Sequence, residues 1–76
     1  MPKSDAKLDV SGLRCPLPLL RAKKALKGLE TGEILEVIAT DPSTEQDFAA
    51  FVKQTGHVLL DYQIKENSYY YWLQKK

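Results

Sequence analysis

Two one-sided helical patterns constrain the fold of this chain more than any other feature of its sequence. The apolar positions of the first pattern recur at spacings of three and four residues and so share one helix face: Leu19, Ala22, Leu26 and Leu29. The second pattern has a corresponding stripe: Phe48, Phe51, Val52 and Thr55. Because each helix has only one apolar face, we expect both helices to pack against a sheet.

Strand patterns precede, separate and follow the two helices. We expect strands over residues 6–10, 33–40, 58–65 and 69–74, with a turn at Glu66-Asn67-Ser68 before the last of them. In the second strand Leu35, Val37 and Ala39 share one face. The third strand alternates along its whole length, with one face made by Val58, Leu60, Tyr62 and Ile64. The element order is therefore β-α-β-α-β-β.

The helix boundaries are marked by proline, glycine and small polar residues. The first helix is predicted to begin at Cys15, in or near the N-cap position, with Pro16 and Pro18 at its first and third positions, where a missing N–H costs nothing. It ends near Gly28. For the second helix, either Asp41 is the cap and Pro42 the first residue, or Ser43 and Gln46 form a capping box. Gly56 ends it.

These elements predict an α+β fold, a two-layer α/β sandwich. Right-handed crossovers place both helices on one face of a mixed four-stranded sheet, which we expect to be mostly parallel with the last strand antiparallel. The 76 residues allow a single domain over residues 6–76, after a flexible N-terminus over residues 1–5. With one Cys and one His, the chain has neither a disulfide nor a four-ligand zinc site, so we expect no metal and no cofactor.

Hydropathy and charge indicate where in the cell this protein is expected and what kind of partner it is expected to bind. The chain has no apolar run near the roughly 20 residues of a membrane span and no apolar leader, so a cytoplasmic protein with a reduced thiol is expected. Its net charge is +1. However, residues 14–27 contain five basic residues and no acidic one, while the rest of the chain has six basic and ten acidic residues. One short segment is therefore basic within an acidic molecule.

Cys15 is the candidate functional residue. It follows a strand and precedes a helix, where the helix dipole and the neighbouring Arg14 favour a thiolate. We therefore predict a nucleophilic thiol, supported by Arg14, Pro16 and Pro18, with a pKa below the ordinary value of about 8.5. The alternative is a small buried hydrophobic residue, but the flanking prolines and charges place Cys15 outside both helix stripes.

The chain offers little to assist this thiol. The single histidine, His57, follows the second helix and would serve as a base only if the fold brought it to Cys15, so we interpret it as a surface residue at a helix C-terminus. There is no second cysteine to resolve a disulfide. A lone thiol of this kind suits exchange between molecules, in which another protein supplies the second sulfur.

At this point the sequence resembles a known family, the small sulfur carriers of the TusA/SirA/YedF type. The resemblance rests on Leu8-Asp9, Gly-Leu-Arg-Cys-Pro-Leu-Pro at residues 12–18, Asp41-Pro42 and Gly56-His57. It implies that Cys15 accepts sulfane sulfur as a persulfide from a cysteine desulfurase or a rhodanese-like donor and passes it to a cysteine of a downstream acceptor protein. Family members serve tRNA thiolation, sulfur oxidation or cofactor sulfuration. The carriers of the tRNA route most often have Glu between the two prolines, where this chain has Leu17.

Other readings remain open beside this one. The basic residues of the first helix, Arg21, Lys23, Lys24 and Lys27, lie off its apolar stripe and are predicted to dock an acidic partner; a solvated helix face is the alternative. The run Tyr69-Tyr70-Tyr71-Trp72 could stack RNA bases on the bare sheet face, with either Tyr69 and Tyr71 or Tyr70 and Trp72 in the core, but few basic residues accompany it, so direct nucleic-acid binding is not favoured. A regulatory interaction module is the remaining class. Whether a carrier of this type is itself an enzyme is left open.

Overall fold

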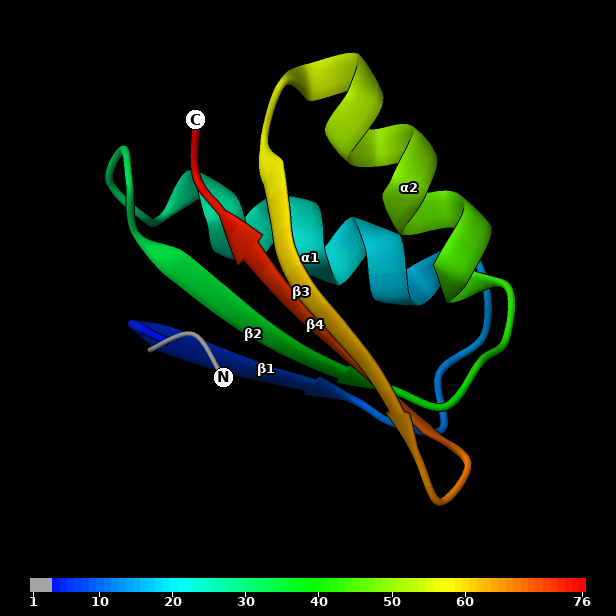
Figure 1. Ribbon diagram of the computed structural model, residues 1–76. Helices are drawn as coiled ribbons and strands as arrows, with labels where there is room; N and C mark the ends of the chain where they lie inside the picture. Colours follow the sequence, from blue (N-terminus) through cyan, green and yellow to red (C-terminus); the bar gives the residue numbers. More distant parts are fainter. Residues whose placement is uncertain (1–3) are drawn as a thin grey trace.

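The computed structural model describes residues 4–76 and arranges them in two layers (Figure 1). The elements are β1 (Ala6–Val10), α1 (Leu17–Lys27), β2 (Ile34–Ala39), α2 (Thr44–Thr55), β3 (Val58–Lys65) and β4 (Ser68–Gln74). Both helices lie on one face of a single mixed sheet, as predicted, and the opposite face carries no helix (Figure 1). Within residues 4–76, no helix is long and apolar enough to cross a membrane.

The strands of the sheet run in the directions that the sequence predicted. The strand order is β1-β2-β4-β3, with β1 parallel to β2 and with β4 antiparallel to both β2 and β3. β1, β2 and β3 therefore share one direction and the last strand runs against them; the place of β4 between β2 and β3 was not predicted. This central place has a physical reason: β4 contributes Tyr71, Trp72 and Leu73, which are all at most 2% exposed and which an edge strand would not bury.

The core lies between the helices and the sheet. The predicted inner face of β2, made by Leu35, Val37 and Ala39, is fully buried. It packs with Ala22 and Leu26 of α1 and with aromatic residues of α2 and β4. Among these, Phe48 meets Tyr71 edge to face, with ring centroids 4.6 Å apart. Burying side chains of this size stabilises the fold by about 1.5–3 kcal/mol each, which is how a chain without a disulfide holds together.

The edge strand β3 is not regular. Its register with β4 shifts between Leu59 and Asp61, so that Leu59 pairs with Leu73 and Tyr62 pairs with Tyr71. Leu59 and Tyr62 therefore face the same side of the sheet, and the predicted unbroken alternation over residues 58–65 is wrong. A bulge of this kind adds one residue to a strand and twists it, and such bulges are common at exposed sheet edges.

The predicted flexible N-terminus falls partly outside the described residues, since residues 1–3 are not described. Asp5, the residue before β1, hydrogen-bonds twice to Ile34 of β2. Its N–H donates to the Ile34 carbonyl at 2.8 Å, and its carboxylate accepts the Ile34 N–H at 2.8 Å. The pairing of β1 with β2 thus continues to Asp5.

Candidate functional site

Two loops, residues 11–16 and residues 40–43, lie side by side where β1 and β2 end (Figure 1). The Gly12 N–H donates to the Thr40 hydroxyl at 2.8 Å, and the Cys15 N–H donates to Asp41 Oδ2 at 2.6 Å. Gly12 has φ +82°, a conformation that residues with a side chain rarely adopt. The backbone of Cys15 is therefore fixed by a carboxylate from the neighbouring loop.

The first helix begins later than the sequence predicted. Its first residue is Leu17, with Pro16 at the N-cap and Pro18 at the second helical position, and the Cys15–Pro16 peptide bond is cis. Cys15 therefore precedes the N-cap. The Leu17 N–H donates to the Arg14 carbonyl at 2.8 Å, and neither proline has an N–H to offer. Few amides of the first turn are left to stabilise a thiolate.

The thiol itself is exposed and bonded to a carboxylate. Its S–H donates to Asp47 Oδ2, with 3.0 Å between sulfur and oxygen. This hydrogen bond is the main reason why the pKa of Cys15 lies above its ordinary value; partial desolvation and the negative charges of Asp47 and Asp41 act in the same direction. The Ser43 hydroxyl acts weakly the other way. The prediction of a lowered pKa is wrong because the hydrogen bond to Asp47, followed by partial desolvation and the charge of Asp47, raises the pKa of Cys15.

Arg14 supports the site through Asp41 rather than through the sulfur. It lines a hollow of about 350 Å³ together with Gly12, Thr40 and Asp41. The pKa of Asp41 is lowered chiefly by the Ser43 N–H, then by the Cys15 N–H, with the charge of Arg14 as a smaller cause. Arg14 therefore helps to keep Asp41 ionised, and ionised Asp41 holds the Cys15 backbone.

The carboxylates of Asp41 and Asp47 are the functional residues that the sequence analysis missed. Asp41 was interpreted mainly as a possible helix start; that start is wrong, whereas the alternative with Ser43 at the N-cap is correct in its position but not in its capping bond. The helix begins at Thr44, and its N-cap residue Ser43 forms no capping bond; instead its N–H donates to Asp41 Oδ1 at 3.0 Å. The sequence did carry a signal for Asp41. Loops that follow two neighbouring parallel strands meet at one edge of a sheet, and this rule alone would place the loop with Asp41 near the loop with Cys15.

A buried hydrogen-bond chain ties this edge to the core. Thr44 is fully buried, and its hydroxyl donates to the Asp41 carbonyl at 2.7 Å. The Tyr71 hydroxyl lies 2.7 Å from the Thr44 hydroxyl oxygen. Because the Thr44 proton is already used in the bond to Asp41, Tyr71 is the donor of this second bond. Burial raises the pKa of Tyr71 to about 12, which keeps this donor protonated. The loop that holds Cys15 is thereby connected to the central strand β4.

The four basic residues of α1 line two different hollows. All four are exposed. Arg21 and Lys24 line a hollow beside Leu8 of β1. Lys23 and Lys27 line another beside Phe51 and His57, and the Lys23 ammonium lies 5.8 Å from the centre of the Phe51 ring. We call these pairs the β1-side pair and the α2-side pair.

His57 lies far from the thiol along α2. It follows the C-terminal end of this 12-residue helix, which is about 18 Å long, whereas Asp47 lies near its beginning. The His57 Nδ1 accepts the Lys76 N–H at 2.9 Å, and burial, with the charges of Lys75 and Lys76, lowers its pKa. The sequence interpretation of a surface histidine, not a base for Cys15, fits this position.

Together, the fold and the site define a class: small two-layer α+β domains that present a single thiol just before their first helix. The sulfurtransferase TusA family model matches residues 6–75. The chain is 48% identical over 71 residues to a sulfur carrier protein TusA of Allochromatium vinosum, covering 93% of each chain. It is 63% identical over 54 residues to a putative sulfur carrier protein of Neisseria meningitidis, covering 71% of this chain and 73% of the relative. The crystal structure of a SirA-like protein from Desulfitobacterium hafniense is similar, with a TM-score of 0.76 and 28% identity over 91% of this chain and 93% of that one.

The chain therefore belongs to the TusA family of sulfur carriers. This confirms the resemblance on which the sequence analysis relied, and it supports a role in sulfur relay for the chain. A carrier in such a relay implies, in general terms, a donor and an acceptor of sulfur.

Proposed function

We propose that this protein accepts sulfane sulfur as a persulfide on Cys15 and passes it to a cysteine of a partner protein. The observation that carries the proposal is the exposed thiol of Cys15, the single cysteine of the chain, on a loop whose backbone is held by Asp41. Membership of the sulfur-carrier family supports it. A regulatory or RNA-binding module would have no need for a thiol fixed in this way.

The chemistry is two successive thiol exchanges, which balance without an added oxidant. The Cys15 thiolate attacks the outer sulfur of the donor's persulfide, the sulfur–sulfur bond of the donor breaks, and the donor cysteine leaves as a thiolate. Cys15 then holds the extra sulfur. An acceptor thiolate attacks this outer sulfur, and Cys15 leaves as a thiolate in turn. Each step moves one sulfur atom and restores one thiolate.

The first step requires Cys15 to lose its proton, which Asp47 opposes. While the S–H donates to Asp47 at 3.0 Å, the neutral thiol is favoured. A positive charge of a docked partner, placed against Asp41 and Asp47, would weaken this preference. We therefore propose that the carrier is less reactive when alone and that docking of the correct partner increases the fraction of Cys15 present as thiolate.

The donor in this proposal is a cysteine desulfurase or a rhodanese-like protein, and the acceptor is a protein with a reactive cysteine. The product, whether thiolated tRNA, an oxidised sulfur compound or a sulfurated cofactor, depends on the acceptor. Leu17 lies between the two prolines, is 44% exposed and follows the thiol closely along the chain. It is therefore a candidate for the residue that selects the acceptor.

Intact-protein mass spectrometry tests the proposal. The protein is incubated with a cysteine desulfurase, cysteine and pyridoxal phosphate, then separated from the enzyme. We expect the mass to increase by one sulfur atom, the increase to map to the peptide that contains Cys15, and a reducing thiol to reverse it. If the mass stays unchanged with both a desulfurase and a rhodanese-like donor, the proposed function is wrong.

The two pairs of basic residues provide a second prediction, about docking. Because charges at the rim of an interface act mainly on the association rate, reversing the pair that contacts the donor should slow sulfur loading a few-fold at low salt and much less at high salt. We expect this for one double variant, either R21E with K24E or K23E with K27E. The other double variant is its matched control.

Both variants should react with a small polysulfide as fast as the wild type does, since that reagent needs no docking surface. Loading rates are measured by mass spectrometry with each donor at two salt concentrations. Equal slowing with the polysulfide would mean that these residues act on the thiol itself. If neither variant slows loading from the protein donor, these residues are a solvated helix face.

A further inference from the structure

The sheet face without helices carries a stacked aromatic pair, with Trp72 buried and Tyr70 half-buried, that the thiol chemistry does not use. By the register of the sheet, Tyr69 and Tyr71 face the helices, and Tyr70 and Trp72 face the other way. The rings of Tyr70 and Trp72 stack at 6.3 Å with 19° between their planes. Trp72 is only 2% exposed, although no helix covers this face.

The indole of Trp72 lacks an acceptor. Its N–H is buried and has no hydrogen-bond partner among residues 4–76. A buried donor without a partner is unfavourable, so a bound group that supplies an acceptor is favoured there. Trp72 also lines a hollow, together with Glu36, Gln63, Lys65 and Tyr70. An unpaired donor at a hollow points to a ligand.

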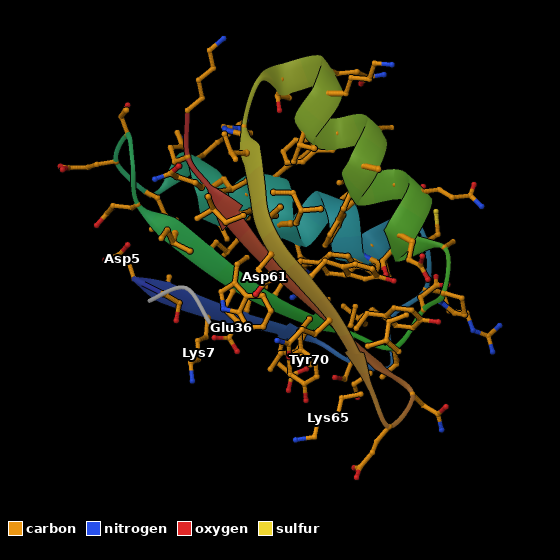
Figure 2. All side chains as sticks on the ribbon, viewed as in Figure 1. Asp5, Lys7, Glu36, Asp61, Lys65 and Tyr70 are labelled. Atoms are coloured by element: carbon orange, nitrogen blue, oxygen red, sulfur yellow. The ribbon has the colours of Figure 1, made fainter. Side chains whose placement is uncertain are left out.

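The charges around Trp72 indicate what kind of ligand fits. The register places Glu36 of β2 on one side of Trp72 and Asp61 of β3 on the other. Figure 2 shows Glu36 and Asp61 near one another, with Tyr70 and then Lys65 further towards the hairpin. Among residues 4–76, Glu36 accepts one long bond of 3.4 Å from the Ser4 hydroxyl, and Lys7 of β1 lies opposite Glu36 in the register of the sheet. Two carboxylates beside a pair of aromatic rings favour the binding of a cation.

The size of the hollow excludes large ligands. Its volume is about 150 Å³. Pockets for cofactors and drug-sized molecules measure about 300–1,000 Å³, so this hollow accommodates one side chain rather than a nucleotide. The two carboxylates would also repel the phosphates of RNA. One cationic side chain of a protein segment matches the negative charge of the hollow, its volume and its aromatic lining.

We propose that this face is a second docking surface, which takes one arginine side chain of a partner protein between Glu36 and Tyr70. The guanidinium stacks on Tyr70, the more exposed ring of the pair, and pairs with the carboxylates, and the side chains over the indole move aside so that a backbone carbonyl of the same segment accepts the Trp72 N–H. Lys65, at the hairpin end, disfavours segments with several adjacent cations. Because the surface lies on the layer away from α1 and α2, a partner bound there leaves Cys15 accessible.

Trp72 is the single tryptophan of the chain, so its fluorescence reports on this surface directly. The probe is the peptide acetyl-Ala-Arg-Ala-amide, and the matched control replaces arginine by citrulline, which has the same shape and no charge. We expect a saturable change in the emission of the wild-type protein with the arginine peptide, and binding that is about three- to tenfold weaker with citrulline. An equal response to both peptides, or none, overturns the proposal.

Variants and a second ligand sharpen the test. E36Q combined with D61N should weaken binding of the arginine peptide to the level of the citrulline peptide, whereas E45Q, on the helix side, should not. All variants should still load sulfur on Cys15, which separates this surface from the proposed function. Saturable binding of single-stranded oligouridylate in place of the arginine peptide would assign the surface to RNA and refute the proposal.

Discussion

The Cys15→Ser variant is expected to lose sulfur loading completely and to melt at the same temperature as the wild type. A hydroxyl does not form a persulfide, and the chain has no other cysteine. The fold should not depend on the sulfur, because the side chain is exposed and the contact between Cys15 and Asp41 uses the backbone N–H. The serine hydroxyl also remains able to donate to Asp47. Intact mass after incubation with a sulfur donor and thermal melting measure the two effects.

Ser11→Ala is the matched control for this variant. Ser11 is exposed on the same loop, and alanine keeps the backbone N–H that donates to Asp9 at 2.9 Å, although it loses the hydroxyl that also lowers the pKa of Asp9. The control should load sulfur as fully as the wild type. A persulfide found on Cys15→Ser would place the carrier chemistry elsewhere. A marked loss of stability in the same variant would mean that Cys15 is a packing residue, the alternative considered from the sequence.

The layers of the fold were predictable because they depend on local patterns. Leu35, Val37 and Ala39 alternate along one strand, and Ala22 and Leu26 recur along one helix, so each buried face is visible within a few residues. The pairing of the strands was not. Placing β4 between β2 and β3, and shifting the register at Leu59, depend on contacts between distant segments that no local pattern encodes.

In the site, too, the features set by local sequence were predictable, and those set by contacts between distant segments were not. The Cys-Pro-x-Pro motif points to Cys15, because prolines at this spacing, followed by a helical pattern, fit the beginning of a helix. The partner of the thiol, Asp47, lies 32 residues further along the chain and reaches it only after α1 and α2 pack beside each other. The helix dipole and Arg14 were visible in the sequence and favour the thiolate. The sign of the pKa shift was decided by a carboxylate in contact with the sulfur, which only the tertiary structure reveals.

The Asp47→Asn variant should therefore show a lower thiol pKa than the wild type. Asparagine keeps the shape of the side chain but removes the charge that disfavours the thiolate, and the hydrogen bond it offers to a neutral thiol is weaker. At neutral pH we expect the variant to react with iodoacetamide several-fold faster, because a larger fraction of its cysteine is ionised. The alkylation rate, measured against pH, gives the midpoint for each protein.

The sign of this change distinguishes two roles of Asp47. If the carboxylate holds the thiol protonated, its removal moves the midpoint to lower pH and speeds reaction with a small polysulfide at neutral pH. If Asp47 instead assisted proton removal, the variant would react more slowly at every pH below its midpoint, which would contradict our interpretation. Glu45→Gln is the control, since Glu45 is an acid of the same first turn that does not contact the thiol and whose loss should leave the midpoint unchanged. Faster reaction of Asp47→Asn with the polysulfide, without a matching gain from the protein donor, would indicate that the donor already neutralises Asp47 on docking.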